Sequence, residues 1–184
     1  MSAKLLNYLS TKSGKLHRFA HAMVRQTLLE ELPLTRRVRM HARIGEVLEQ
    51  MYGQQAKRHA AELAFHFNLA ETVTGSEKLA HFALLAGEEA LEKFAYEEAM
   101  GYFQRGLEAK EGRATDAETA ALLFGYSRAR RIFDLRTGGG RKLSSDEEVI
   151  LGTSRRAFDY YLEHRDIAGL VAVATFGPFI APPQ

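Results

Sequence analysis

Apolar side chains recur along most of the chain at the spacing of amphipathic helices. In one segment they are Met40, Ile44, Val47, Leu48 and Met51, with charged residues on the opposite side. The same pattern predicts helices over about 35–52, 57–70, 76–94, 96–111, 115–136, 145–163 and 166–175. Antiparallel helices joined by turns this short form an array of α-helical hairpins, and we therefore expect an all-α fold.

Polar residues that can cap a helix stand at several of the expected starts. They are Thr35, Ser76 and two pairs with capping-box spacing, Thr115 with Glu118 and Ser145 with Glu148. Gly53 and Gly112 follow the ends of two helices, where a left-handed residue commonly terminates the helix. The run 137–145, which contains three consecutive glycines, is the clearest linker in the chain.

The first twenty residues differ from the rest. Two short apolar runs flank the turn-forming residues 10–14, which predicts a β-hairpin. A two-stranded hairpin is marginal in water, and the expected helix from about His21 to Leu32 is its natural support.

Composition supports helices and excludes several classes of protein. The chain has 26 Ala and 23 Leu against only 7 Val and 5 Ile, which argues against a sandwich, a barrel or a parallel-sheet enzyme. It has no cysteine, so disulfide scaffolds and thiol chemistry are excluded, and a reducing cytoplasm is the expected location. The longest apolar stretch, 167–181, is too short to span a bilayer, so we expect no membrane association.

Charge is distributed unevenly although the net charge is only +2. Residues 1–50 hold nine Lys and Arg against four Glu, whereas residues 71–111 hold nine Glu against four Lys and Arg. Such a division favours pairing of adjacent surfaces over binding to a polyanion. Arg36, Arg37, Arg39 and Arg43 could contact phosphates, but no aromatic residues alternate with them, and we expect no direct contact with nucleic acid.

The region 80–111 resembles the tetratricopeptide repeat, a pair of helices with small residues at fixed offsets. The matching positions are Ala83, Gly87, Ala99, Phe103 and Gly106. We expect Gly87 to face Ala99 where the two helices meet, and Gly106 to admit the following helix. Residues 115–175 keep this pattern more loosely.

Because repeat units bury their faces only against neighbours, the apolar 167–181 stretch predicts that the chain is part of a longer protein.

The segments HRFAHAMVRQTLLEELPL at 17–34 and RRVRMHARIGEVLE at 36–49 resemble the corresponding junction in bacterial regulators of the signal-transduction ATPase (STAND) class. There a nucleotide-binding module ends in a winged helix and tetratricopeptide-like helices follow. The resemblance implies that residues 1–34 end a winged-helix domain, with 35–136 and 146–184 forming repeat helices. Members carry a LuxR-type DNA-binding domain, an activator-type winged helix or a cyclase domain elsewhere.

Related receptors use a Met-His-Asp motif whose histidine contacts the β-phosphate of ADP. The resemblance places His21 at that position, between Ala20 and Ala22, so the Met and the Asp are absent. A neutral histidine can donate to a phosphate oxygen, and the alternative is that His21 only packs against the hairpin. No P-loop accompanies it, so we expect no bound cofactor in this segment.

Two further patterns have simpler structural explanations. His59, Glu62 and His66 lie along one helical stripe, but the spacing is not His-Glu-x-x-His, and packing at the border of the apolar face is preferred to a metal site. Residues 138–144 lack the spacing of a phosphate-binding loop and have no preceding strand, which favours the linker.

The sequence therefore predicts a non-enzymatic segment that binds a protein partner or small effector in a groove, or packs against the adjacent ATPase module. The first helix of the repeat offers Lys78, His81, Phe82 and Leu85 for this groove. One alternative is the regulatory arm of an adenylate or guanylate cyclase with an ATPase module. Another is a free-standing adaptor.

Overall fold

The computed structural model describes residues 32–137 and 145–176, with side chains in the second range described from residue 148 onward. The chain divides into two compact units, residues 1–37 and residues 38–184. The predicted β-hairpin, the helix at 21–32, His21 and the glycines of the linker lie outside the described residues.

The described residues fold into helices, without a strand among them, and this confirms the all-α prediction for that part of the chain. The elements are α3 (Leu34–Tyr52), the 3₁₀ helix η1 (Gly53–His59), α4 (Ala60–Asn68), α5 (Glu71–Thr74), α6 (Ser76–Glu92), α7 (Tyr96–Ala109), α8 (Ala117–Thr137), α9 (Ser145–Glu163) and α10 (Ile167–Phe176). In the described part, no helix is long and apolar enough to cross a membrane.

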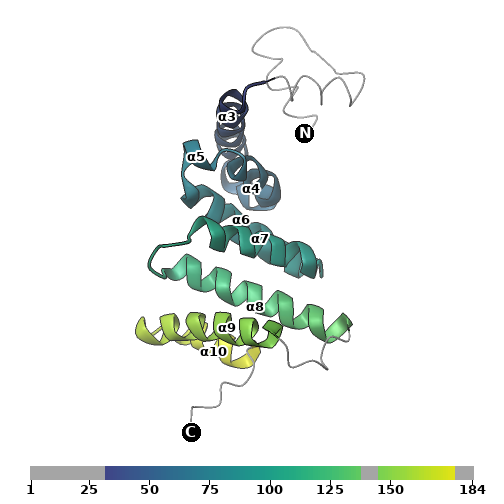
Figure 1. Cartoon of the computed structure of the whole chain (residues 1–184), viewed down its shortest axis with the longest axis vertical. Coiled ribbons are helices and arrows are strands. Elements are labelled where there is room, and N and C mark those ends of the chain that lie inside the picture. Colours follow the sequence, from purple (N-terminus) through teal and green to yellow (C-terminus); the bar gives the residue numbers. More distant parts are fainter. Residues whose placement is uncertain (1–31, 138–144, 177–184) are drawn as a thin grey trace. The chain divides into compact units, whose positions relative to one another are not determined.

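Within the second unit, helices that follow one another in sequence lie side by side (Figure 1). α6 packs against α4 and α7, and α8 packs against α7 and more lightly against α6. α9 covers α8, and α10 packs against α9. The helix α7 therefore has a neighbour on each side, so its inward-facing side chains are well placed to hold three helices together.

Two clusters of buried apolar residues fill the spaces between these helices. One joins α6, α7 and α8 through Ala80, Ala90, Leu91, Ala99, Phe103, Leu122 and Ala129. The other joins α8, α9 and α10 through Ala120, Leu123, Phe124, Ala157, Tyr161 and Val173. α8 contributes to both clusters, which explains why its apolar residues are not confined to one face.

Three predicted helix caps are wrong. α3 begins one residue before Thr35, and the carbonyl oxygen of Pro33 accepts hydrogen bonds from its first turn. Gly75 occupies the N-cap of α6 at φ 76°, and the Ser76 hydroxyl is buried without a hydrogen-bond partner among the described residues. At α8 the cap is Asp116 instead of Thr115: the backbone N–H of Thr119 donates to Asp116 Oδ1 at 2.7 Å.

The helix ends predicted from glycines agree better with the structure than the predicted helix starts do. α3 ends at Tyr52 directly before Gly53, which has φ 49°, and Gly112 follows α7 with φ 76°. The stretch from Gly53 to His59 is a 3₁₀ helix and not coil, so the helix predicted from residue 57 has its α-helical part from Ala60 onward.

Candidate functional site

Phe103 is the residue that brings α6, α7 and α8 into close contact. Its ring is fully buried, between Gly87 of α6 and Gly125 of α8. A Cβ atom built at either glycine would lie 2.5 Å from Cε1 of Phe103, so a side chain at either position would force the ring or a helix to shift. The nearest atoms to Gly87 therefore belong to Phe103 and not to Ala99, because the aromatic ring extends into the space that the glycine leaves.

Gly106 and Ala83 lie at a second close approach among the same helices. A Cβ atom at Gly106 would lie 2.6 Å from Cδ2 of Leu122 in α8 and 3.4 Å from the Cβ of Ala83 in α6. Ala83 and Ala99 are themselves fully buried. The small residues at these positions thus allow backbone and side chains of three helices to approach closely.

Contact between an aromatic ring and a glycine recurs elsewhere in the second unit. A Cβ atom at Gly45 in α3 would lie 2.9 Å from Cε1 of Phe67 in α4, and one at Gly169 in α10 would lie 2.5 Å from Tyr161 in α9. The glycines of the Gly45–Phe67 and Gly87–Phe103 contacts are 42 residues apart (87 − 45) and the rings are 36 apart (103 − 67), so both separations fall within the range of helical repeat lengths although they are not equal. Gly45 was not among the predicted packing residues, although a glycine on the apolar side of a helix indicates a close approach.

The residues expected to line a groove point in different directions. Phe82 is only 4% exposed and its ring stacks against Phe67 with centroids 5.5 Å apart, so it belongs to the packing between α4 and α6. Lys78 pairs with Glu49 of α3 and lies over the Phe67 ring. His81 is exposed and Leu85 is half-buried, so these two remain available at the surface of α6.

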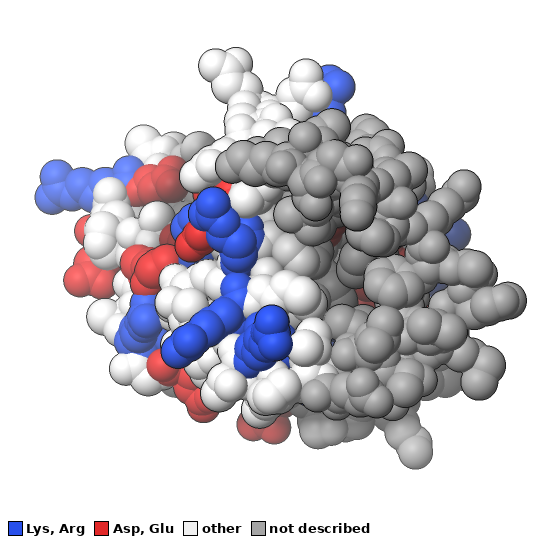
Figure 2. Space-filling view, turned by 90° about the horizontal axis from the view of Figure 1, so that it is seen from above, with Lys and Arg blue, Asp and Glu red and all other residues white. Residues whose placement is uncertain are grey.

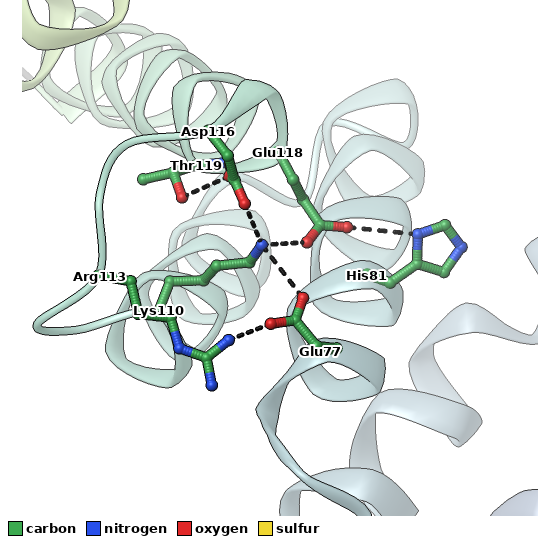
Figure 3. A network of polar contacts seen from close by, with 7 residues as sticks. All are labelled: Glu77, His81, Lys110, Arg113, Asp116, Glu118 and Thr119. Carbon is green, nitrogen blue, oxygen red and sulfur yellow. Dashed lines mark hydrogen bonds and ion pairs between the residues drawn. The ribbon is translucent and has the colours of Figure 1, made fainter.

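A buried lysine connects the three central helices. The Lys110 side chain, at the end of α7, is only 3% exposed. Its Nζ lies 2.7 Å from Asp116 Oδ2, 2.9 Å from Glu118 Oε2 and 3.4 Å from Glu77 Oε2 of α6 (Figure 3). Arg113 pairs with the other oxygen of Glu77, and His81 Nδ1 lies 3.4 Å from Glu118 Oε1. We call these six residues with Thr119 the Lys110 network.

Charges in the Lys110 network stabilise one another. Burial alone would lower the pKa of Lys110, but the hydrogen bonds to Asp116 and Glu118 and their negative charges outweigh it, and the pKa is raised. Burial alone would raise the pKa of Asp116, but hydrogen bonds from Lys110 and Thr119 lower it to about 2. At neutral pH the lysine is therefore a charged anchor for three carboxylates, and its protonated amine has no lone pair for attack on a substrate.

The predicted stripe of His59, Glu62 and His66 begins at the end of η1 and continues into α4, and its side chains make separate contacts. His59 stacks on the ring of Tyr52 with centroids 3.7 Å apart, and Glu62 accepts a hydrogen bond of 2.8 Å from the Tyr52 hydroxyl. His66 turns instead toward His41 of α3, with the two Nδ1 atoms 2.9 Å apart. Among the described residues no three His, Asp or Glu side chains gather as metal ligands.

His66 is a buried neutral base. It is only 2% exposed, and its burial is the main reason that its pKa falls to about 4. The charge that His41 can carry lowers the pKa further, while Glu62 opposes the shift. One Nδ1 of the pair must carry a hydrogen and donate the hydrogen bond while the other accepts it, so this contact requires that the two rings are not both protonated.

A hollow beside the turn between α6 and α7 was not predicted. It has a volume of about 320 Å³ and is lined by Phe94, Ala95, Tyr96, Glu97, Glu98 and Phe133. Phe94 and Tyr96 meet edge to face with centroids 6.5 Å apart, and the guanidinium of Arg136 lies over the Tyr96 ring at 5.6 Å. Exposed aromatic rings beside carboxylates can bind a cation.

Of the four arginines considered as phosphate ligands, Arg43 lies 3.6 Å from the carboxylate of Glu46, one turn later on α3. Among the described residues that Figure 2 shows, basic and acidic side chains lie next to one another.

Comparison of the chain with protein-family models, with curated proteins and with solved structures found no match.

Proposed function

We propose that this chain is a non-catalytic, tetratricopeptide-like helical scaffold that binds a partner protein within a signal-transduction ATPase regulator of transcription. The observation that supports it best is the repeated contact between a glycine and an aromatic ring, at Gly45–Phe67 and again at Gly87–Phe103. Repeat scaffolds use such close contacts to stack one helix pair on the next and leave the outer residues free for binding.

The Lys110 network supports the same function. It fixes the start of α6, the end of α7 and the start of α8 to one another through a buried ammonium group. A binding surface on rigid helices loses less conformational entropy when a partner docks, so a scaffold of this kind favours binding. The resemblance of residues 17–49 to the junction in STAND regulators supplies the proposed context.

Photo-cross-linking in the cell that makes the protein tests partner binding. A benzophenone amino acid at Leu85, on α6, is expected to give one discrete adduct whose protein, once purified, binds the chain. The matched control carries the same group at Gln104, an exposed position on α7. Adducts that are diffuse at both positions, or a partner that does not bind when purified, would contradict the proposal.

Two further measurements test its other parts. Calorimetry of the full chain with ATP and ADP is expected to show no binding, because this sequence contains no P-loop to hold the phosphates; a saturable heat would contradict it. Sequencing the adjoining reading frame is expected to find a P-loop upstream, and a frame without one would refute the regulator context.

A further inference from the structure

Phe94 occupies a backbone position that favours glycine. It has φ 61°, directly after the last residues of α6, and its N–H donates to the carbonyl of Leu91 at 3.0 Å. The next N–H, of Ala95, donates to Ala90 at 2.9 Å, which completes the hydrogen bonds of a left-handed helix end. A bulky side chain is strained in this conformation because its Cβ approaches the backbone.

Burial does not compensate for this strain. The Phe94 side chain is 70% exposed, so it contributes little to the core. Among the described residues, the other positions with a positive φ are Gly53, Gly75 and Gly112, and Arg165, which is exposed, is the second residue other than glycine. A strained, exposed aromatic residue points to a role outside folding.

The surroundings of Phe94 indicate what would bind there. Its ring, with those of Tyr96 and Phe133, forms the aromatic part of the hollow, and the exposed carboxylates of Glu97 and Glu98 form the acidic part. An anion would be repelled by the two glutamates, and a purely apolar group would desolvate them without a partner. The two carboxylates also offset the partial positive charge at the start of α7.

Arg136 shows that one of these rings already accepts a guanidinium. Its side chain lies over Tyr96 at 5.6 Å from the ring centroid. A guanidinium is planar, stacks on aromatic rings and donates paired hydrogen bonds to a carboxylate, whereas the ammonium of lysine is a compact and strongly hydrated charge. Of the two basic side chains, arginine is therefore the one that complements both the aromatic part and the acidic part of the hollow.

We propose that the hollow formed by Phe94, Tyr96, Phe133, Glu97 and Glu98 binds an arginine side chain of a partner protein. This inference rests on the proposed function and names the chemistry by which the partner is recognised. The two glutamates pair with the guanidinium, and the exposed ring of Phe94 covers one of its faces. The strain at Phe94 is retained because glycine at this position would remove that ring.

Titration of the full chain with N-acetyl-argininamide, followed by NMR of the ring protons, tests the site. We expect saturable shifts of the Phe94, Tyr96 and Phe133 resonances. The matched probe N-acetyl-citrullinamide has nearly the same shape but no charge, and its shifts should be at least tenfold smaller at equal concentration. Equal shifts with both probes would overturn the proposal, because they would show that charge is not recognised.

Two variants separate loss of binding from loss of folding. Phe94→Gly relieves the left-handed strain, so the variant should unfold at the same temperature as the parent chain or higher, and yet should lose the shifts produced by the arginine probe. The double variant Glu97→Gln, Glu98→Gln should weaken binding about tenfold, whereas Glu111→Gln, beyond the end of α7, should leave it unchanged. Full binding by Phe94→Gly would overturn the proposal.

Failure at this site can be distinguished from failure of the proposed function. If the arginine probe does not bind while the cross-linker at Leu85 still captures a partner that binds when purified, the chain is a scaffold and the hollow is not its recognition site. If neither occurs, both proposals fail.

Discussion

At the scale of single residues, the stability of the central helices depends on the charge of Lys110. Replacement by methionine keeps the length of the side chain but leaves Glu77, Asp116 and Glu118 without their shared cation. Because these carboxylates are partly exposed to water, we expect Lys110→Met to lower the free energy of unfolding by about 1–3 kcal/mol. Urea unfolding measures this, and an unchanged midpoint would refute the role of Lys110.

Lys93→Met is the matched control. Lys93, the residue that follows α6, pairs with Glu89, which lies one turn earlier on the exposed surface of that helix. Hydrated pairs of this kind contribute little, so the urea midpoint of this variant should stay close to that of the parent chain.

Two glycines with opposite surroundings test the packing around Phe103. A methyl group at Gly87 would overlap the Phe103 ring, so Gly87→Ala should destabilise the fold by about 1–3 kcal/mol. A methyl group at Gly101 in α7 would meet no atom within 4 Å, and Gly101→Ala should stabilise it by about 0.5–1 kcal/mol through helix propensity. The unfolding temperatures of both variants, compared with that of the parent chain, test these two expectations. A loss of stability in Gly101→Ala alone would contradict the packing described.

The contact between the buried His66 and the half-buried His41 makes stability depend on pH. The pKa of His66 is about 4 in the folded chain and 6.5 for the free side chain, so the unfolded chain binds more protons between these values. Stability should therefore fall as the pH drops from 6.5 toward 4, by up to about 3 kcal/mol. Among the described residues, two other titratable groups face this ring: a positive charge on His41 lowers the pKa of His66, and the negative charge of Glu62 raises it.

Urea unfolding at pH 7 and pH 5 measures this dependence. His66→Leu should reduce the difference in stability between the two pH values, whereas His164→Leu, at an exposed histidine near the end of α9, should not. If both variants retain the full difference, another group is responsible.

At the scale of the helices, the start of α8 allows a direct test of which residue, Asp116 or Thr115, caps the helix. The Asp116 carboxylate accepts hydrogen bonds from the backbone and hydroxyl of Thr119 and from Lys110. Asp116→Ala should therefore cost about 1–2 kcal/mol, while Thr115→Ala should cost much less. Since the pKa of Asp116 is about 2 in the folded chain, its contribution is complete above pH 4 and is lost as the pH falls toward 2.

Helical periodicity predicted the elements well because apolar spacing directly reflects burial. It predicted α3 and α9 to within about a residue, and missed η1 because residues 53–59 carry no apolar period. Caps were less predictable, since Thr115 and Asp116 both offer an oxygen to the same turn and only the backbone path decides. The Lys110 network was missed because Glu77 and Lys110 are far apart in sequence, and their contact depends on how α6 packs against α7.

The candidate site was predictable only where a residue's size determines its role. The offsets of Gly87 and Gly106 predicted positions of close approach, yet the ring that meets Gly87 could not be identified from spacing alone. Phe82 has the same apolar character as a groove residue, and only the position of Phe67 shows that it is buried. The hollow beside Phe94 depends on one left-handed φ angle, for which an aromatic residue gives no signal.

For the molecule as a whole, α6, α7 and α8 should open together. They share the Phe103 cluster and the Lys110 network, whereas the only buried side chain of α10 is Val173. Hydrogen exchange should show strong and similar protection across α6–α8 and faster exchange in α10. Lys110→Met should lower the protection of all three central helices at once, and a change confined to α7 would contradict this cooperative unit.

Because one aromatic ring fills the space beside both Gly87 and Gly125, the sizes of three side chains on three helices are coupled. A methyl group gained at position 87 or 125 becomes tolerable only after position 103 has shrunk. In a library that randomises these three positions together, folded members should divide into two groups: a large residue at 103 with glycine at the other two, or a small residue at 103 with added side chains around it. Substitutions that are each harmful alone would therefore be selected as a set.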